Sequence, residues 1–265
     1  MEFGLKGKTA LVLGGGGDLG RAISIALAGE GANIAVADID NKAIAETEAA
    51  LAKIDSKAVG KCIGLGWDLA DLSSIDAHVT KIECELGPVD VLVNITGGPP
   101  PTPASLQDPA LWTKHFQAMV LSVIAITDRV LPGMRERKWG RIITSTSSGV
   151  ISPIPNLAIS NALRLSLVGW SKSLAREVGK DGITANIILP GRIATERTRF
   201  LDQAKAAREG RTVEDVSTES VKSIPLGRYG KPAEYAAAVA FLASERAAYI
   251  TGSIIRVDGG LIASI

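Results

Sequence analysis

The chain has 265 residues, enough to bury a full core, and we expect residues 1–265 to form a single α/β domain. Its net charge of +1 gives no electrostatic reason to expect nucleic acid or an anionic membrane as a partner. The two cysteines, Cys62 and Cys84, make no metal-binding pattern and fit a reducing compartment. The first residues lack a signal-peptide pattern, and no apolar run approaches the roughly 20 residues of a membrane span. These features predict a soluble cytoplasmic protein without a metal site.

Short apolar, β-branched runs alternate with longer stretches of helical periodicity along the whole chain. The runs that predict strands lie at 9–13, 33–37, 61–67, 89–93, 141–144, 184–189 and 254–257. The stretches that predict helices lie near 19–29, 41–53, 72–86, 109–137, 157–179 and 232–243. This alternation predicts an α/β fold, a Rossmann-type doubly wound parallel sheet of about seven strands with helices on both faces. Such sheets bind ligands at the carboxyl ends of their strands.

A glycine-rich segment, Leu13–Gly20, follows the first predicted strand and opens the first predicted helix. Glycines at this point permit a tight turn and a close backbone approach to a ligand. The helix N-terminus adds free N–H groups and partial positive charge. The spacing Gly14-x-x-Gly17-x-x-Gly20 therefore predicts a binding site for the pyrophosphate of a dinucleotide, with Leu19 among the contacting residues.

Asp18 lies inside this glycine-rich segment and allows two interpretations. As the N-cap of the first helix it would stabilise that helix by about 0.5–2 kcal/mol. As a carboxylate beside the pyrophosphate it would repel the ligand and weaken dinucleotide affinity. We favour the N-cap.

Asp38 ends the second predicted strand and is followed by Ile39. A carboxylate at this point accepts hydrogen bonds from the adenosine ribose hydroxyls and repels a 2′-phosphate. No Arg or Lys directly follows the glycines or Asp38, and the nearest candidate to hold a 2′-phosphate is Lys42. The pair Asp38–Ile39 therefore predicts NAD rather than NADP, and the alternative is a solvated aspartate at a strand end.

Further segments continue this pattern in chain order: Asp68-Leu69, Asn94–Gly97, Pro190–Thr195, Ile224–Pro232 and Val257–Gly260. With the glycine turn and Asp38 they extend over nearly the whole chain. The sequence resembles the short-chain dehydrogenase/reductases, in particular the β-ketoacyl-acyl-carrier-protein reductases. The resemblance implies that NAD is also contacted by Asp68, Leu69, Asn94, Gly97, Pro190, Gly191, Ile193 and Thr195.

The resemblance also identifies the four positions that carry proton transfer in this family. Ser147 keeps the serine that holds the substrate oxygen. Ser160 stands in place of the tyrosine acid, Arg164 in place of the lysine, and Met119 in place of the asparagine. The positions that face the cofactor are kept, whereas three of the four that transfer the proton are substituted.

Ser160 and Arg164 are four residues apart, so they share one face of the predicted helix. A serine hydroxyl lacks the acidity of a tyrosine, and an arginine stays protonated and cannot relay a proton. Arg164 is able to grip the nicotinamide ribose, a carboxylate, a halide or a developing oxyanion. Ser147 either binds a substrate carbonyl or satisfies the backbone of its own strand end. These three residues are our candidate catalytic group.

Two segments near the predicted pocket depart from the regular alternation. Gly97–Pro103 is stiffened by prolines and forms either a wall of the pocket mouth or a rigid surface loop. The stretch at 196–223 resembles the mobile substrate lid of short-chain reductases. Near it, Arg192, Arg197 and Arg199 hint at an anionic group, with solvated charges as the alternative.

Three hypotheses follow. The first is an NAD(H)-dependent oxidoreductase that acts on a small-molecule carbonyl or secondary alcohol by a non-standard proton transfer. The second is a non-redox enzyme on the same fold, like the halohydrin dehalogenases, which also carry Arg at the lysine position but keep the tyrosine and lack the dinucleotide site. The third is a catalytically quiet NAD-binding protein. The resemblance further implies a homotetramer or homodimer that pairs through the helices near 109–137 and 157–179.

Overall fold

The computed structural model describes residues 2–54 and 60–265. Its seven strands form one sheet in the order β3-β2-β1-β4-β5-β6-β7, and every pair of neighbours is parallel. The strands are β1 (Thr9–Leu13), β2 (Asn33–Asp38), β3 (Cys62–Gly66), β4 (Val89–Asn94), β5 (Gly140–Ser145), β6 (Ile183–Pro190) and β7 (Ile254–Val257). This topology confirms the predicted fold class. The order reverses between β1 and β4, which opens a crevice at their carboxyl ends.

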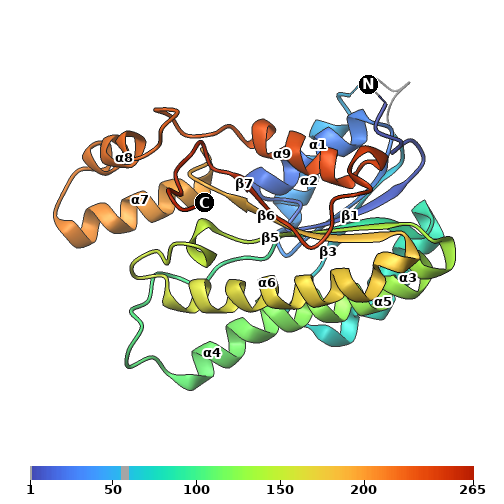
Figure 1. Cartoon of the computed structure of the whole chain (residues 1–265), viewed down its shortest axis with the longest axis horizontal. Coiled ribbons are helices and arrows are strands. Elements are labelled where there is room, and N and C mark those ends of the chain that lie inside the picture. The colour runs from blue at the N-terminus through green and yellow to red at the C-terminus, as the bar shows by residue number, and fades with distance from the viewer. Residues whose placement is uncertain (1, 55–59) are drawn as a thin grey trace.

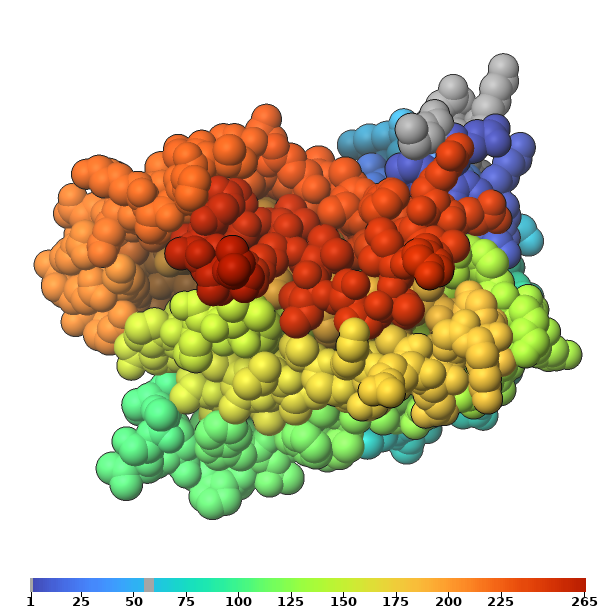
Figure 2. All heavy atoms as spheres, in the orientation of Figure 1, coloured from blue at the N-terminus to red at the C-terminus, as the bar shows by residue number. Residues whose placement is uncertain are grey.

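The helices cover both faces of the sheet (Figure 1). One face is covered by α1 (Asp18–Gly29), α2 (Asn41–Leu51) and α9 (Pro232–Ala243), and the other by α3 (Ile75–Leu86), α5 (Ser122–Arg137) and α6 (Ala158–Val178). The short helix α4 (Pro109–Phe116) lies beneath α6. Two more helices, α7 (Glu196–Glu209) and α8 (Val213–Lys222), form the predicted lid segment. They stand out at one end of the molecule beside the C-terminal segment (Figure 2).

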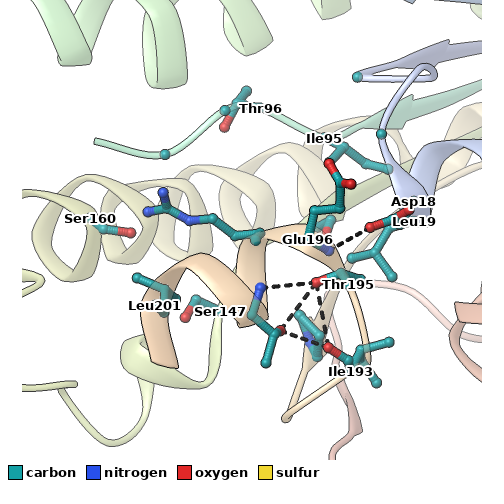
Figure 3. Close-up of a pocket in the computed structure, with 18 of the residues that line it drawn as sticks. Asp18, Leu19, Ile95, Thr96, Ser147, Ser160, Ile193, Thr195, Glu196 and Leu201 are labelled. Carbon is teal, nitrogen blue, oxygen red and sulfur yellow. Dashed lines mark hydrogen bonds between the residues drawn. The ribbon is translucent and has the colours of Figure 1, made fainter. Parts of the chain in front are cut away.

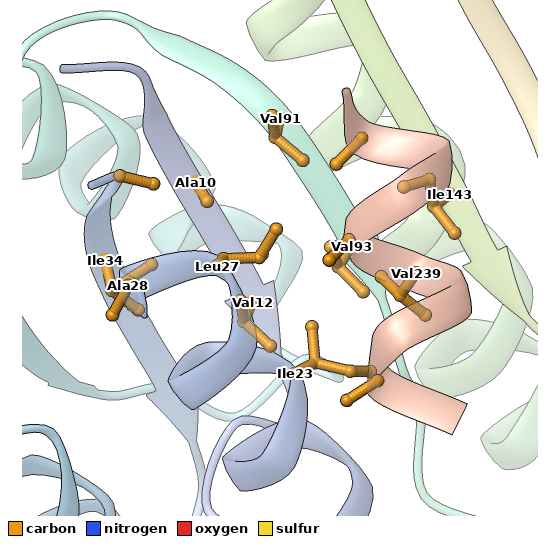
Figure 4. Close-up of a cluster of buried hydrophobic side chains, with 14 of the residues drawn as sticks. Ala10, Val12, Ile23, Leu27, Ala28, Ile34, Val91, Val93, Ile143 and Val239 are labelled. Carbon is orange, nitrogen blue, oxygen red and sulfur yellow. The ribbon is translucent and has the colours of Figure 1, made fainter. Parts of the chain in front are cut away.

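The central strand β1 is buried on both faces, which explains its uninterrupted apolar sequence. Ala10 and Val12 point to the α1–α9 side and pack against Leu27 and Val239 (Figure 4). The alternate residues of β1 pack in the core on the opposite face. Full burial of a side chain such as Leu27 contributes about 1.5–3 kcal/mol of hydrophobic stabilisation. The two cores fix the strand ends, and so the crevice, in place.

The helix predicted over 109–137 is confirmed, and it contains a π-helical segment, Gln117–Leu121, between α4 and α5. The wider turn carries Met119, which is 2% exposed and packs with Ile159 and Leu163 of α6. The residue at the family's asparagine position therefore lies in the core, packed against α6.

The whole segment Pro109–Arg137 is long and apolar enough to cross a membrane by length and composition, contrary to the sequence prediction that no such run exists. Of its most apolar window, 44% is buried inside the structure. Val123, Ile126 and Val130 contribute to the hydrophobic cores below the sheet. In this structure the segment packs as a core helix of the α/β fold.

Candidate active site

A large pocket opens at the carboxyl ends of the strands, between the glycine turn, the loop after β4, the start of α6 and the lid helices (Figure 3). It brings together the predicted site residues with one exception, Asn94. Those that line it are Gly14, Gly17, Asp18, Leu19, Gly20, Asp38, Ile39, Asp68, Leu69, Gly97, Ser147, Ser160, Arg164, Pro190, Gly191, Ile193 and Thr195.

The glycine turn is shaped by steric limits that only glycine meets. Gly14 has a φ of +65°, and a Cβ there would lie 2.6 Å from the carbonyl oxygen of Ile95. A Cβ on Gly20 would overlap the carbonyl oxygen of Gly14, and one on Gly16 would lie 2.7 Å from Ala43. The backbone of the turn is therefore not covered by side chains at the start of α1. This backbone cradle fits the diphosphate of a dinucleotide.

Asp18 is the first residue of α1 and not its N-cap, so the favoured interpretation was wrong. The cap is Gly17, which makes no side-chain cap hydrogen bond. Instead, Oδ2 of Asp18 accepts a hydrogen bond of 2.7 Å from the backbone N–H of Glu196, the first residue of α7 (Figure 3). The first N–H groups of a helix have no intrahelical partner, so α7 offers the carboxylate a donor. Asp18 thus links the glycine turn to the lid.

Asp38 lies at the end of β2, beside the glycine turn. Its Oδ2 accepts from the N–H of Gly16 at 3.0 Å and its Oδ1 from the N–H of Asp40 at 3.1 Å. Sequence reasoning missed Arg21, which also lines the pocket here. Arg21 forms an ion pair of 2.8 Å with Glu46, so its charge is already matched. Its position on α1, four residues after Gly17, was the signal that could have found it.

The other expected cofactor residues differ in what holds them. Asp68 accepts from the N–H of Ala70 at 2.9 Å and orders its own loop. Asn94 is fully buried, and its Nδ2 donates to Oγ1 of Thr144 at 3.1 Å, which joins β4 to β5 beneath the pocket. Its burial explains why Asn94 does not reach the pocket wall.

Thr195 caps the lid helix α7. Its hydroxyl oxygen accepts from the N–H of Thr198 at 3.2 Å (Figure 3). Nearby, Arg192 forms an ion pair of 2.9 Å with the buried Asp202 of α7 and donates to Ser220 of α8 at 3.3 Å. Arg192 therefore ties the two lid helices to β6, and its charge is matched. Arg192 also lines the pocket, so an anionic group near it stays a prediction.

Ser147 and Ser160 present hydroxyls to the pocket from different elements. Ser147 is half-buried after β5, and its Oγ accepts from the N–H of Gly149 at 3.1 Å, so its own proton stays free to donate. Ser160 is 7% exposed on the first turn of α6. Within residues 2–54 and 60–265 its hydroxyl makes no hydrogen bond. Both hydroxyls are available to a ligand oxygen.

Arg164 is buried at 9% exposure, and its guanidinium is anchored to the backbone. Nη2 donates to the carbonyl oxygens of Thr96 and Gly97, each at 3.1 Å, and Nη1 donates to that of Ser145 at 3.4 Å. Burial, with the nearby charge of Arg197, lowers the pKa of Arg164 to about 10. The side chain remains charged at neutral pH. A guanidinium has five N–H donors, so some remain for a ligand.

A buried tyrosine lies behind the pocket and was missed by sequence reasoning. Tyr235 of α9 is fully buried, with its Oη 2.8 Å from Oγ of Ser145 and 3.3 Å from the carbonyl oxygen of Ile188. Burial raises the pKa of Tyr235, so it stays protonated at neutral pH. Its place in an apolar helix gave no sequence signal. It holds the Ser145 strand end and does not line the pocket.

The loop after β4 forms a wall of the pocket, as one of the two interpretations of Gly97–Pro103 predicted. Gly97, Gly98 and Pro101 line the cavity. Arg197, in the first turn of α7, donates from Nη2 to the carbonyl oxygen of Pro99 at 2.8 Å. This hydrogen bond joins the first turn of α7 to the loop after β4.

Comparison with known proteins decides the family. The family model described as Enoyl-(Acyl carrier protein) reductase matches residues 17–262. The chain is 37% identical over 258 residues to the 3-oxoacyl-(acyl-carrier-protein) reductase FabG of Escherichia coli, covering 97% of this chain and 98% of that protein. Nodulation protein G of Azospirillum brasilense is also 37% identical, over 96% of this chain and 98% of that protein. The chain belongs to the short-chain dehydrogenase/reductase superfamily.

Solved structures of this superfamily share the whole fold. YwfH, an NADPH-dependent reductase involved in bacilysin biosynthesis, matches with a TM-score of 0.91 at 28% identity, over 97% of this chain and 99% of its own. L-sorbose reductase from Gluconobacter frateurii, complexed with NADPH and L-sorbose, matches with a TM-score of 0.91 at 29% identity, over 100% of both chains. These relatives are reductases that use a nicotinamide cofactor.

Proposed function

We propose that this protein is an NAD(H)-dependent oxidoreductase that interconverts a small-molecule carbonyl compound and a secondary alcohol. The supporting observation is one pocket that joins a glycine cradle at the start of α1 to the hydroxyls of Ser147 and Ser160 and the charge of Arg164. When bound, the nicotinamide supplies the hydride. The residues of the chain have to hold the cofactor, orient the substrate and stabilise the negative charge that develops on the substrate oxygen.

Asp38 supports NAD over NADP. The carboxylate is fixed by the N–H of Gly16 at the edge of the pocket, where the adenosine ribose of a dinucleotide is expected. The nearby Arg21 is matched by Glu46 and bonded to the carbonyl oxygen of Gly16 at 3.2 Å. A 2′-phosphate would meet the negative charge of Asp38, and among the described residues that line this part of the pocket Lys42 is the cation free to oppose it.

Ser147, Ser160 and Arg164 form the group proposed to act on the substrate oxygen. Both serine hydroxyls are free to donate, and Arg164 supplies a permanent positive charge in a buried position. A charge held in place before reaction stabilises an alkoxide without reorganisation. Neither residue type is an acid near neutral pH, so the proton that completes reduction comes from water, with the Ser160 hydroxyl orienting it.

A second candidate function is a catalytically quiet NAD-binding protein. The favouring observation is that Arg164 uses its guanidinium to hold three backbone carbonyls around the pocket. A side chain with that role stabilises the pocket whether or not any substrate is converted.

A homotetramer, or a homodimer, is the proposed assembly. Three apolar side chains are exposed near one another in the helical layer: Phe116 on α4, Leu121 on the π-helical segment between α4 and α5, and Leu165 on α6. Beside them lies a shallow apolar hollow lined by Trp112, Thr113, Phe116 and Leu163. A second copy would cover these side chains, and light scattering of the purified protein measures the assembly directly.

The test of function is a fluorescence titration with NADH and NADPH, followed by turnover assays on neutral and acidic carbonyls and secondary alcohols. We expect NADH to bind more tightly than NADPH and at least one substrate class to turn over. Absence of dinucleotide binding would rule out both candidate functions. Binding without turnover on every substrate would favour the quiet NAD-binding protein.

A further inference from the structure

Two arginine side chains from different elements meet inside the pocket. Arg164 comes from α6 and Arg197 from the first turn of the lid helix α7, and both line the cavity. A Cβ placed on Gly98 would lie 3.0 Å from Nη2 of Arg197 and 3.8 Å from Nη2 of Arg164. Both guanidiniums therefore lie against the same residue of the loop after β4, where the absence of a side chain leaves room for them.

The charges of these two side chains are not matched by a carboxylate. Among the described residues, neither forms an ion pair, and their hydrogen bonds go to backbone carbonyls. Carbonyl oxygens satisfy N–H donors but do not cancel a net charge. By contrast, Arg192 is paired with Asp202 at 2.9 Å. Arg164 is buried and Arg197 is exposed, so the cost to the protein alone is mainly that of the unmatched Arg164 charge, and an anion placed beside both guanidiniums lowers it.

We propose that Arg164 and Arg197 bind a carboxylate of the substrate, so that the substrate class is short oxo acids and the corresponding hydroxy acids. A guanidinium presents a planar fork of donors that matches a carboxylate. In a short oxo acid the carboxylate and the reacting oxygen are close enough for Arg197 and one N–H of Arg164 to hold the carboxylate while Ser160 and another N–H of Arg164 meet the reacting oxygen. The oxo-acid assignment rests on the proposed oxidoreductase function, whereas carboxylate binding itself does not.

The cofactor diphosphate is a poor match for this pair of arginines. A diphosphate is expected at the glycine turn and the N-terminus of α1. The arginines instead contact the carbonyls of Thr96, Gly97 and Pro99, in the loop after β4. Arg164 shares α6 with Ser160, where the substrate is expected, and Arg197 reaches the same residue of the loop, Gly98, as Arg164 does.

The test compares an acid with its neutral ester. Binding of 2-oxobutanoate and of methyl 2-oxobutanoate is measured by calorimetry, with and without NADH, on the wild type, Arg197→Gln and Lys205→Gln. Lys205 is a matched control because it lines the lid side of the same pocket but pairs with Glu219 at 3.3 Å. We expect the wild type to bind the acid about tenfold or more tighter than the ester. Arg197→Gln should lose that preference and Lys205→Gln should keep it.

The outcomes separate this proposal from the proposed function. Equal affinity for acid and ester, or an unchanged preference in Arg197→Gln, would overturn it, even if NADH supports turnover of neutral carbonyls. Loss of NADH affinity in Arg197→Gln with the acid still bound would also overturn it and assign Arg197 to the cofactor. Inorganic phosphate that competes better than the acid would overturn the carboxylate class. Acid binding without turnover would support the anion site and count against the oxidoreductase function.

Discussion

The glycine turn at the start of α1 and the face of α6 that carries Ser160 line one pocket, yet they are built in different ways. The turn depends on backbone geometry, because side chains at Gly14 and Gly20 would collide with neighbouring carbonyl oxygens. The α6 face depends on side chains, with Ser160 unbonded in the described structure and Arg164 anchored to three carbonyls. A backbone cradle tolerates change in other side chains. Proton transfer depends on the chemistry of individual side chains and so changes with each substitution.

The largest expected effect comes from closing the backbone cradle. Gly20→Ala puts a Cβ onto the carbonyl oxygen of Gly14, so NADH affinity should fall about a hundredfold or more. Gly29→Ala is the control, because a Cβ at this position of the same helix meets nothing within 4 Å. Fluorescence titration with NADH and thermal unfolding check both variants. NADH binding unchanged in Gly20→Ala would show that the turn is not the binding site.

The next effect concerns the anchoring of the α6 face. Arg164→Ala leaves the carbonyls of Thr96 and Gly97 without their donor, and the free energy of unfolding should fall by about 1–3 kcal/mol. Arg199→Ala, on the exposed side of α7, should change it by no more than about 0.5 kcal/mol. Denaturant unfolding measures both. An Arg164→Ala protein as stable as the wild type would mean that these hydrogen bonds do not hold the loop.

A third variant tests the proposed preference for NAD over NADP. Asp38→Ser removes the carboxylate that the N–H of Gly16 fixes beside the glycine turn. The ratio of NADH affinity to NADPH affinity should fall about tenfold, because ribose contacts and 2′-phosphate repulsion are lost together. Glu214→Ser, an exposed acidic residue of α8 outside the pocket, should leave the ratio unchanged. A ratio unaffected by Asp38→Ser would refute the proposed NAD preference.

The smallest expected effect concerns the link between turn and lid. Asp18→Asn removes a negative charge at the start of α1 while keeping an acceptor for the N–H of Glu196. NADH affinity should rise about fivefold at low salt, and the gain should shrink as ionic strength rises. Glu136→Gln, an exposed charge on α5, serves as the control. Weaker NADH binding in Asp18→Asn would show that the carboxylate helps to hold the cofactor.

The sequence predicted the sheet well and the side-chain contacts poorly. The bounds of β1 and β7 were predicted residue for residue; for β1 the reason is that a short apolar run buried on both faces has few alternatives. Asp18 was misassigned because its partner, Glu196, is remote in the sequence. The same holds for the bond between Arg197 and Pro99 and for Tyr235 behind Ser145. Local patterns carry no information about partners that only the folded chain brings together.

The central claim is that the protein keeps its cofactor site but has altered proton-transfer chemistry. The most direct test restores the tyrosine and the lysine of the family. In the double variant Ser160→Tyr, Arg164→Lys, NADH affinity is measured first, because retained binding shows that the pocket is still formed. The value of kcat/KM for the best substrate is then compared with that of the wild type. We predict that NADH affinity is kept and that kcat/KM falls, because Ser160 and Arg164 carry chemistry of their own. A gain of a hundredfold or more would contradict this account and identify an ordinary reductase limited by its missing tyrosine and lysine.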